Sequence, residues 1–185
     1  VGFVLAGGAI QKFGTPEQKA RFLAPYASGK KLGCFSLTEP EAGSDATNQN
    51  VSARREGDQY VINGRKVFVT NGREAHAALI FAQTDRTRKS RGISAFLIEK
   101  GTPGFNVGKT EDKLGIRASD TAEFVFEDCR VPAAHRLGAE VPVAGGHGGC
   151  RRSLRRLPAA GSDGDVRGAR SRCEPAVPDR RCSRA

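Results

Sequence analysis

Methionine and tryptophan are absent from this chain of 185 residues, which opens on Val1. Because the first residue is not methionine, we expect the chain to be a fragment of a longer protein. The sequence also lacks any apolar run near the ~20 residues that a membrane helix needs. Its start lacks the charged and apolar regions of a secretory signal. These absences predict a soluble protein with no membrane segment.

Cysteine occurs five times at irregular spacing and forms neither a CxxC pair nor an even disulfide framework. We therefore expect reduced thiols in a cytosol-like compartment, and the sequence does not distinguish a bacterial cytoplasm from a mitochondrial matrix. His76, His135 and His147 have no carboxylate or serine partner at a telling spacing, so we expect surface or core positions for them. No metal site is predicted.

Positive charge is concentrated at one end of the chain. The formal net charge is +10, and residues 141–185 supply ten arginines against three aspartates and one glutamate, or +6 of that total. This tail has no Ile, Phe, Tyr or Lys, and its few Val and Leu follow neither the helical nor the strand period. We expect the tail to be disordered, because it has too little apolar surface to bury.

Two explanations of the tail remain open. An Arg-, Gly-, Ala- and Pro-rich composition without lysine is typical of a GC-rich gene translated out of frame, with a frameshift near residues 138–141. Alternatively, a genuine basic tail would bind nucleic acid or an acidic partner. The absence of aromatic residues for base stacking and of regular arginine spacing favours the frameshift and argues against nucleic acid.

Two short helices are predicted near the start of the chain. One covers residues 4–13. The next begins at the sequence TPEQ, with Thr15 as its N-cap, a proline at the first helical position and Gln18 closing a capping box. We expect this second helix to end near Ala24, because Pro25 limits it.

Short apolar runs separated by turn residues begin at Val51 and are typical of antiparallel strands. In QYVINGRKVFVTNG, two such runs flank Asn63-Gly64, the dipeptide that type I′ turns favour, so a hairpin is predicted there. The repetition of short strands favours a small barrel or sandwich over an α/β sheet. Further strands are predicted at residues 78–83, 92–99, 105–109 and 121–126.

A polar, turn-prone loop follows the apolar run at residues 32–35. The loop has the sequence SLTEPEAGSD, in which Leu37 and Ala42 are the only aliphatic residues. A plain surface loop is one interpretation. The other is a loop whose main-chain N–H groups and hydroxyls face a bound ligand, because glycine permits close backbone approach and Ser and Thr supply short donors.

Three stretches together resemble the acyl-CoA dehydrogenase family: FSLTEPEAGSD at 35–45, INGRKVFVTNG at 62–72 and KLGIRASDTAEFVFEDCRVP at 113–132. Their order and spacing also fit, and the chain looks most like the short-chain, butyryl-CoA branch. The resemblance implies a mainly β fold class, with the family's middle-domain β-barrel preceded by short α-helices. The implied divisions are the end of the N-terminal helical domain at 1–32, the flavin-binding barrel at 33–140 and the disordered tail at 141–185.

The resemblance also implies an FAD site. Residues 35–38 would lie along the pyrimidine edge of the flavin, where main-chain amides and the Thr38 hydroxyl donate, and Phe68 would cover the isoalloxazine. Thr70 matches a hydroxyl residue near N5, and Ser44 also meets the phosphopantetheine or phosphate portion of substrate and cofactor. The implied cofactor-binding residues are Phe35, Ser36, Leu37, Thr38, Gly43, Ser44, Phe68, Val69 and Thr70.

In this family a carboxylate base removes the α proton of an acyl-CoA thioester while the β hydride passes to the flavin, giving the trans-2-enoyl-CoA of fatty acid β-oxidation. Electrons then leave to an electron-transferring flavoprotein. The catalytic glutamate belongs to the family's C-terminal helical domain, so the resemblance implies an inactive chain without a catalytic residue and a homotetrameric parent. An acyl-CoA oxidase of the same fold and a non-catalytic module with a basic binding tail remain alternative functions.

Without the resemblance, three of the implied site residues have structural interpretations. Phe68 alternates with Val67 and Val69 in a predicted strand, so the pattern alone favours a core position. Thr38 and Ser44 would be turn formers.

Other polar residues of these stretches are expected to have structural roles. Glu39 could serve as a base, but the resemblance gives it a structural place. Asp45 is expected to cap its loop. By the same resemblance, Arg117, Ser119 and Asp120 are expected to shape the barrel near the cofactor.

Overall fold

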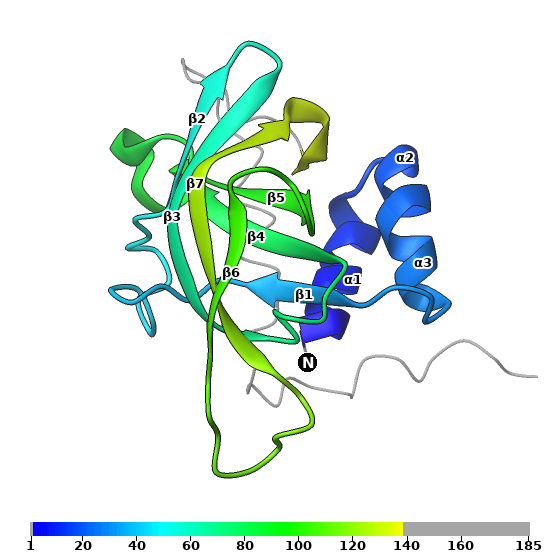
Figure 1. Ribbon diagram of the computed structural model, residues 1–185. Coiled ribbons are helices and arrows are strands. Elements are labelled where there is room, and N and C mark those ends of the chain that lie inside the picture. Colours follow the sequence, from blue (N-terminus) through cyan, green and yellow to red (C-terminus); the bar gives the residue numbers. More distant parts are fainter. Residues whose placement is uncertain (1, 139–185) are drawn as a thin grey trace, which may run out of the picture.

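The structure, a computed structural model, describes residues 2–138 (Figure 1). It is mainly β, as expected, with helices at the start of the chain and one curled sheet after them. The tail expected at 141–185, and His147 within it, lie outside the described residues. Within residues 2–138, no helix is long and apolar enough to cross a membrane.

The helices cover one face of the sheet (Figure 1). α1 (Gly2–Phe13) precedes a second helix made of three consecutive segments, α2 (Pro16–Gln18), the π-helical η1 (Lys19–Leu23) and α3 (Ala24–Ala27). The predicted capping box is confirmed, because Gln18 N donates to Thr15 Oγ1 at 3.2 Å and Thr15 N donates to Gln18 Oε1 at 3.1 Å.

The prediction that the second helix ends near Ala24 is wrong, because the helix continues through Pro25 to Ala27. Proline inside a helix lacks a donor, and its ring clashes with the carbonyl of the preceding turn. Here that turn is π-helical, with Ala24 N–H donating to Lys19 O, and Pro25 stands in the first turn of α3. The wider turn accommodates the proline ring.

Eight strands form one sheet with the order β6-β7-β3-β2-β4-β5-β8, and β1 lies beside β4. β1 and β2 run parallel to β4, whereas the sequence predicted only antiparallel strands. Parallel neighbours need a long crossover connection, which the pattern of a single strand does not reveal. The strands are β1 (Gly33–Ser36), β2 (Ser52–Glu56), β3 (Gln59–Thr70), β4 (Ala77–Gln83), β5 (Ile93–Glu99), β6 (Phe105–Thr110), β7 (Thr121–Pro132) and β8 (Arg136–Leu137), and the short helices η2 (Arg86–Gly92) and η3 (Ala133–His135) adjoin β5 and β8.

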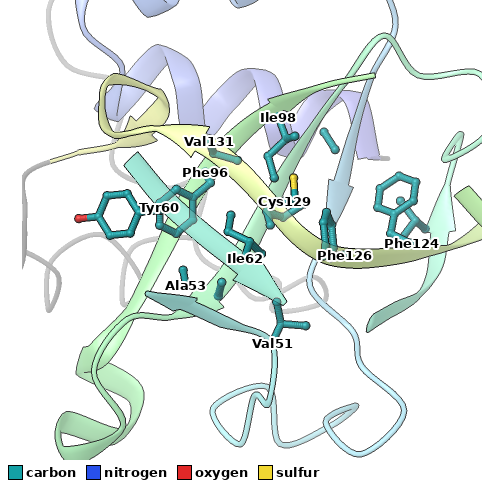
Figure 2. Packing of buried hydrophobic residues seen from close by; sticks show 14 of the residues in the cluster. Val51, Ala53, Tyr60, Ile62, Phe96, Ile98, Phe124, Phe126, Cys129 and Val131 are labelled. Atoms are coloured by element: carbon teal, nitrogen blue, oxygen red, sulfur yellow. The ribbon is translucent and has the colours of Figure 1, made fainter. Parts of the chain in front are cut away.

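β4 separates two apolar cores, because every one of its residues is buried. Successive side chains of a strand point to opposite faces, so Ile80 joins the larger core inside the curl of the sheet and Leu79 joins the smaller core under the helices. Figure 2 shows the larger core, where Ile62, Phe96 and Phe126 converge from three strands. The continuous apolar run of β4 is the pattern of a strand covered on both faces.

The hairpin predicted at Asn63-Gly64 is wrong, because β3 runs through this dipeptide without a break. The turn between β2 and β3 lies earlier, at Gly57-Asp58, where Gly57 has a φ of 62°. β7 instead has a bulge opposite Asn63, where Glu127 and Asp128 face this single residue. Asn63 Nδ2 donates to Asp128 Oδ1 at 3.1 Å and Asn63 Oδ1 accepts from Asp128 N at 2.7 Å, so the bulge is held by side-chain bonds.

Replacing Gly64 by alanine should lower the free energy of unfolding by about 2–4 kcal/mol. Gly64 has a φ of 132°, and an added Cβ would lie 2.9 Å from Val51 Cγ2 and 3.0 Å from Val51 Cα. Gly57→Ala is the matched control, because Gly57 also has a positive φ but open space around its Cβ, and it should cost only about 1–2 kcal/mol. Urea unfolding would compare the two variants, and equal losses would contradict the argument from the Val51 contact.

Candidate functional site

The three sequence stretches singled out above meet around the C-terminal half of β3. Val67 N donates to Thr38 O at 2.9 Å, which places the first stretch alongside this strand. Asn71 N donates to Asp120 O at 2.9 Å, which brings the third stretch to the end of the same strand. Segments far apart in the sequence therefore form one region.

The polar loop after β1 is tightly turned. Glu39 and Ala42 exchange main-chain hydrogen bonds of 3.1 and 3.2 Å, and residues 43–44 after this turn are exposed. Asp45 Oδ1 accepts from the main-chain N and the hydroxyl of Thr47 at 3.2 and 2.6 Å. These bonds, chiefly the one from the hydroxyl, lower the pKa of Asp45. The expectation that Asp45 caps the loop is confirmed.

Phe68 points away from both cores. Phe68 is 64% exposed, whereas the adjacent Val69 is 1% exposed in the larger core. An irregularity opposite β7 between Lys66 and Val69 breaks the alternation of the strand, and Phe68 has a φ of 58°, which is strained for a bulky residue. The core position that alternation alone favours for Phe68 is therefore wrong. Strained backbone at an exposed aromatic residue is a feature of ligand sites.

The implied site residues other than Phe68 and Val69 differ in how far their side chains are buried. Thr38 and Thr70 are half-buried. Ser36 is buried, and its Oγ has no hydrogen-bond partner within residues 2–138. Phe35 and Leu37 are partly buried against the smaller core. These last two residues would offer a ligand mainly their main-chain groups.

A buried ion pair lies beneath the loop, and the sequence did not predict it. Lys66 Nζ donates to Glu39 Oε1 at 2.8 Å, to Leu37 O at 2.9 Å and to Gln49 Oε1 at 3.1 Å. The side chains of Lys66 and Glu39 are 0% and 1% exposed. Burial lowers the pKa of Lys66 to about 8, against the opposing effect of Glu39. The structural place expected for Glu39 is confirmed. Lys66 follows Arg65 in a strand of mixed polarity, so no local sequence signal marks it as the buried partner.

The connection between β6 and β7 reaches the end of β3. Asp120 Oδ2 accepts from Arg73 N at 2.7 Å, Ser119 Oγ donates to Asn71 Oδ1 at 3.3 Å, and Arg117 pairs with an exposed aspartate. A hollow of about 330 Å³ here is lined in part by Arg73, Arg117 and Asp120, but by none of the nine implied cofactor residues. The contacts of Ser119 and Asp120 brace the end of β3.

The two histidines in the described part of the chain have structural contacts. His76 is exposed, and its Nδ1 accepts from Leu32 N at 3.1 Å. His135 is half-buried with its ring edge-on to Phe22 at 5.6 Å, and burial lowers the pKa of His135. Between residues 2 and 138, no group of three or more His, Cys, Asp and Glu side chains is placed to hold a metal ion.

The curled sheet and the region around β3 define the middle domain of an acyl-CoA dehydrogenase: a family model described as acyl-CoA dehydrogenase, middle domain, matches residues 34–129. The chain belongs to this family. It is 53% identical over 131 residues to the mitochondrial short-chain specific acyl-CoA dehydrogenase of Rattus norvegicus, covering 71% of this chain and 32% of the relative. It is 54% identical over 136 residues to the short-chain specific enzyme of Clostridium acetobutylicum, covering 74% and 36%. The chain thus spans about a third of the length of these relatives.

Solved structures agree with this assignment. Butyryl-CoA dehydrogenase from Megasphaera elsdenii matches with a TM-score of 0.73 at 48% identity, covering 75% of this chain and 37% of that chain. A structure of the electron transferring flavoprotein of Acidaminococcus fermentans gives 0.71 at 52% identity, covering 72% and 35%. Glutaryl-CoA dehydrogenase from Mycobacterium smegmatis in complex with FADH2 gives 0.67 at 39% identity, covering 73% and 34%. The resemblance to the short-chain branch is confirmed.

Proposed function

We propose that this chain supplies the flavin-binding middle domain of an acyl-CoA dehydrogenase, and that the whole protein converts an acyl-CoA thioester to the trans-2-enoyl-CoA in fatty acid β-oxidation. The observation that carries the proposal is the meeting of the polar loop at 36–44 with the part of β3 that exposes Phe68. Family membership and 53–54% identity to short-chain acyl-CoA dehydrogenases support it.

The residues of this region fit FAD. A flat ring with hydrogen-bonding edges needs an apolar face and short donors, which Phe68 and the half-buried hydroxyls of Thr38 and Thr70 offer. When bound, FAD supplies the acceptor for the β hydride of the thioester. We assign coverage of the ring to Phe68, donation at the pyrimidine edge to the amides of 35–38 and the Thr38 hydroxyl, and the cofactor chain to residues 43–44. Donors at that edge stabilise the negative charge of the reduced ring.

The order of the elements supports the proposed boundary after residue 32. The last N-terminal helix ends at Ala27 and the first strand begins at Gly33, so a boundary at residue 32 falls in the connection between them. The catalytic base and much of the acyl pocket would belong to the part of the relatives' length that this chain does not cover.

The proposed substrate is an acyl-CoA, the proposed electron acceptor is an electron-transferring flavoprotein, and the whole protein is proposed to be a homotetramer. Similarity to the structure of the Acidaminococcus fermentans flavoprotein supports the acceptor. The similar proteins include a mitochondrial enzyme and a clostridial one, which supports either a mitochondrial matrix or a bacterial cytoplasm.

A chimera of the Megasphaera elsdenii butyryl-CoA dehydrogenase that carries residues 34–129 of this chain should bind FAD and oxidise butyryl-CoA. In the chimera, Thr38→Val combined with Thr70→Val should weaken FAD binding about tenfold or more, because each change removes a hydrogen bond to the ring. Thr110→Val, on the exposed β6, is the matched control. FAD content after dialysis and turnover would be measured, and an unchanged double variant would contradict the assigned roles.

A further inference from the structure

The buried ammonium of Lys66 donates all its hydrogen bonds to acceptors in one loop, the connection between β1 and β2. A protonated lysine has three N–H donors, and those of Lys66 meet the Leu37 carbonyl at 2.9 Å, the Glu39 carboxylate at 2.8 Å and the Gln49 side chain at 3.1 Å. Leu37 stands at the start of the loop between β1 and β2, and Gln49 stands near its end. One point in the interior therefore holds both ends of this loop.

The other contacts of the pair act on the same loop. The Glu39 carboxylate accepts from the main-chain N–H groups of Asn50 and Val51. The residue after Lys66 binds the loop through its main chain, because Val67 N donates to Thr38 O at 2.9 Å. β3 thus fixes the loop through one side chain and one main-chain group, two residues before the exposed Phe68.

Fold stability alone does not explain a charge at this position. Burying an ion pair costs desolvation, and well-packed apolar residues are often as stable or more stable in its place. The loop contributes few apolar side chains of its own, since Leu37 and Ala42 are the only aliphatic residues among 36–45. A loop with so few apolar side chains needs another anchor inside the protein, and Lys66 and Glu39 supply a polar one.

We propose that Lys66 is a positioning residue for the cofactor: with Glu39, it holds residues 36–44 in the arrangement that binds the flavin. This inference rests on the proposed function. It goes beyond the nine implied cofactor residues, because Lys66 is fully buried and acts only through the loop.

The anchor should depend on pH. Burial lowers the pKa of Lys66 to about 8, and Glu39 raises it in opposition. Within residues 2–138, Glu39 is the one charged group bonded to the ammonium. The thiols of the larger core, Cys34 and Cys129, stay neutral because burial raises their pKa values to about 12 and about 11. A neutral amine has only two N–H donors for three acceptors. The loop therefore loses one of its hydrogen bonds to Lys66 as the pH rises through about 8.

Global stability should change in the opposite direction. Between the lowered pKa of about 8 and the ordinary value of 10.5, the unfolded chain holds a proton on Lys66 that the folded chain has released. The folding equilibrium therefore shifts toward the folded state through this group as the pH rises. If FAD binds more weakly as the pH rises while the free energy of unfolding does not fall, Lys66 positions the loop for the flavin and does not serve fold stability alone.

The test is a titration of the complete 185-residue chain with FAD by calorimetry from pH 6.5 to 9.5, with urea unfolding and amide hydrogen exchange in parallel. We expect FAD affinity to fall about tenfold across this range. Lys66→Met should bind FAD about tenfold more weakly at pH 7, without the pH-dependent step, and should expose the Asn50, Val51 and Val67 amides to exchange. Lys109→Met, at an exposed lysine of β6, should match the wild type.

Two outcomes would overturn the inference: wild-type affinity that is flat across pH 8, or loop amides in Lys66→Met that stay as protected as in the wild type. If Lys66→Met does not fold, the wild-type pH series still decides the question, with Lys66→Gln as the second variant. Failure of the wild type to bind FAD at pH 7 would contradict the proposed function, while exchange of the loop amides would still decide whether Lys66 anchors the loop.

Discussion

Replacing Phe96 by alanine should lower the free energy of unfolding by about 3–5 kcal/mol. Phe96 is 0% exposed in the larger core, with its ring centroid 4.9 Å from that of Tyr60 (Figure 2). The strands around it are paired on both sides and cannot collapse onto the vacated volume, so the variant loses both burial and packing contacts. Urea unfolding, with the slope compared between proteins, would measure the loss.

Phe68→Ala is the control for this experiment, because the same side chain is removed from a position that is 64% exposed. It should change the free energy of unfolding by no more than about 0.5 kcal/mol while weakening FAD binding. A loss of stability equal to that of Phe96→Ala would show that Phe68 packs in the fold, and its proposed role over the flavin ring would have to be abandoned.

Glu39→Ala should destabilise the protein by about 3–5 kcal/mol, because it leaves the Lys66 ammonium buried without its carboxylate. It also removes the acceptor of the Asn50 and Val51 N–H groups. The pKa of Lys66 should fall further, since Glu39 is the group that raises it. The stability of the variant should therefore rise with pH over a window that starts lower than in the wild type.

Two comparisons make this prediction specific. Glu39→Leu combined with Lys66→Met should recover part of the lost stability, because the double change removes the unpaired buried charge but still leaves the Asn50 and Val51 N–H groups without their acceptor. Arg21→Ala breaks the Arg21–Glu99 pair, whose side chains are 53% and 34% exposed, and should cost less than about 1 kcal/mol. Denaturant unfolding of the set would check these values, and a Glu39→Ala loss no larger than that of Arg21→Ala would refute the argument from burial.

The capping box and the predicted strands show which features of the fold could be predicted from the sequence. Thr15 and Gln18 satisfy each other's main-chain groups three residues apart, so nothing distant can change the outcome. β4 was predicted within one residue of its start, because a continuous apolar run is buried whichever strands lie beside it. The family-like stretches around Thr38 and Phe68 also predicted where the candidate site lies.

Two predictions, the hairpin at Asn63-Gly64 and the helix end at Pro25, were wrong because contacts with distant residues outweigh the local preference. Asn63-Gly64 favours a turn, but β3 pairs with β7 on both sides of the dipeptide and stays continuous, and the bulge at this point falls on β7. Pro25 favours a helix end, but packing of Tyr26 into the smaller core, together with the π-helical turn, keeps the chain helical. In each case long-range burial outweighs a local preference of about 1–3 kcal/mol.

The sequence by itself determined the mainly β composition, the family and the stretches that form the candidate site, because apolar periodicity and short motifs are local properties of the chain. Only the tertiary structure decided that Phe68 faces solvent while Val69 faces the core, since a bulge opposite β7 sets that alternation. It also decided that Lys66 meets Glu39. A charge can be buried only where a partner supplies the compensating hydrogen bonds, and that partner lies 27 residues away in the sequence.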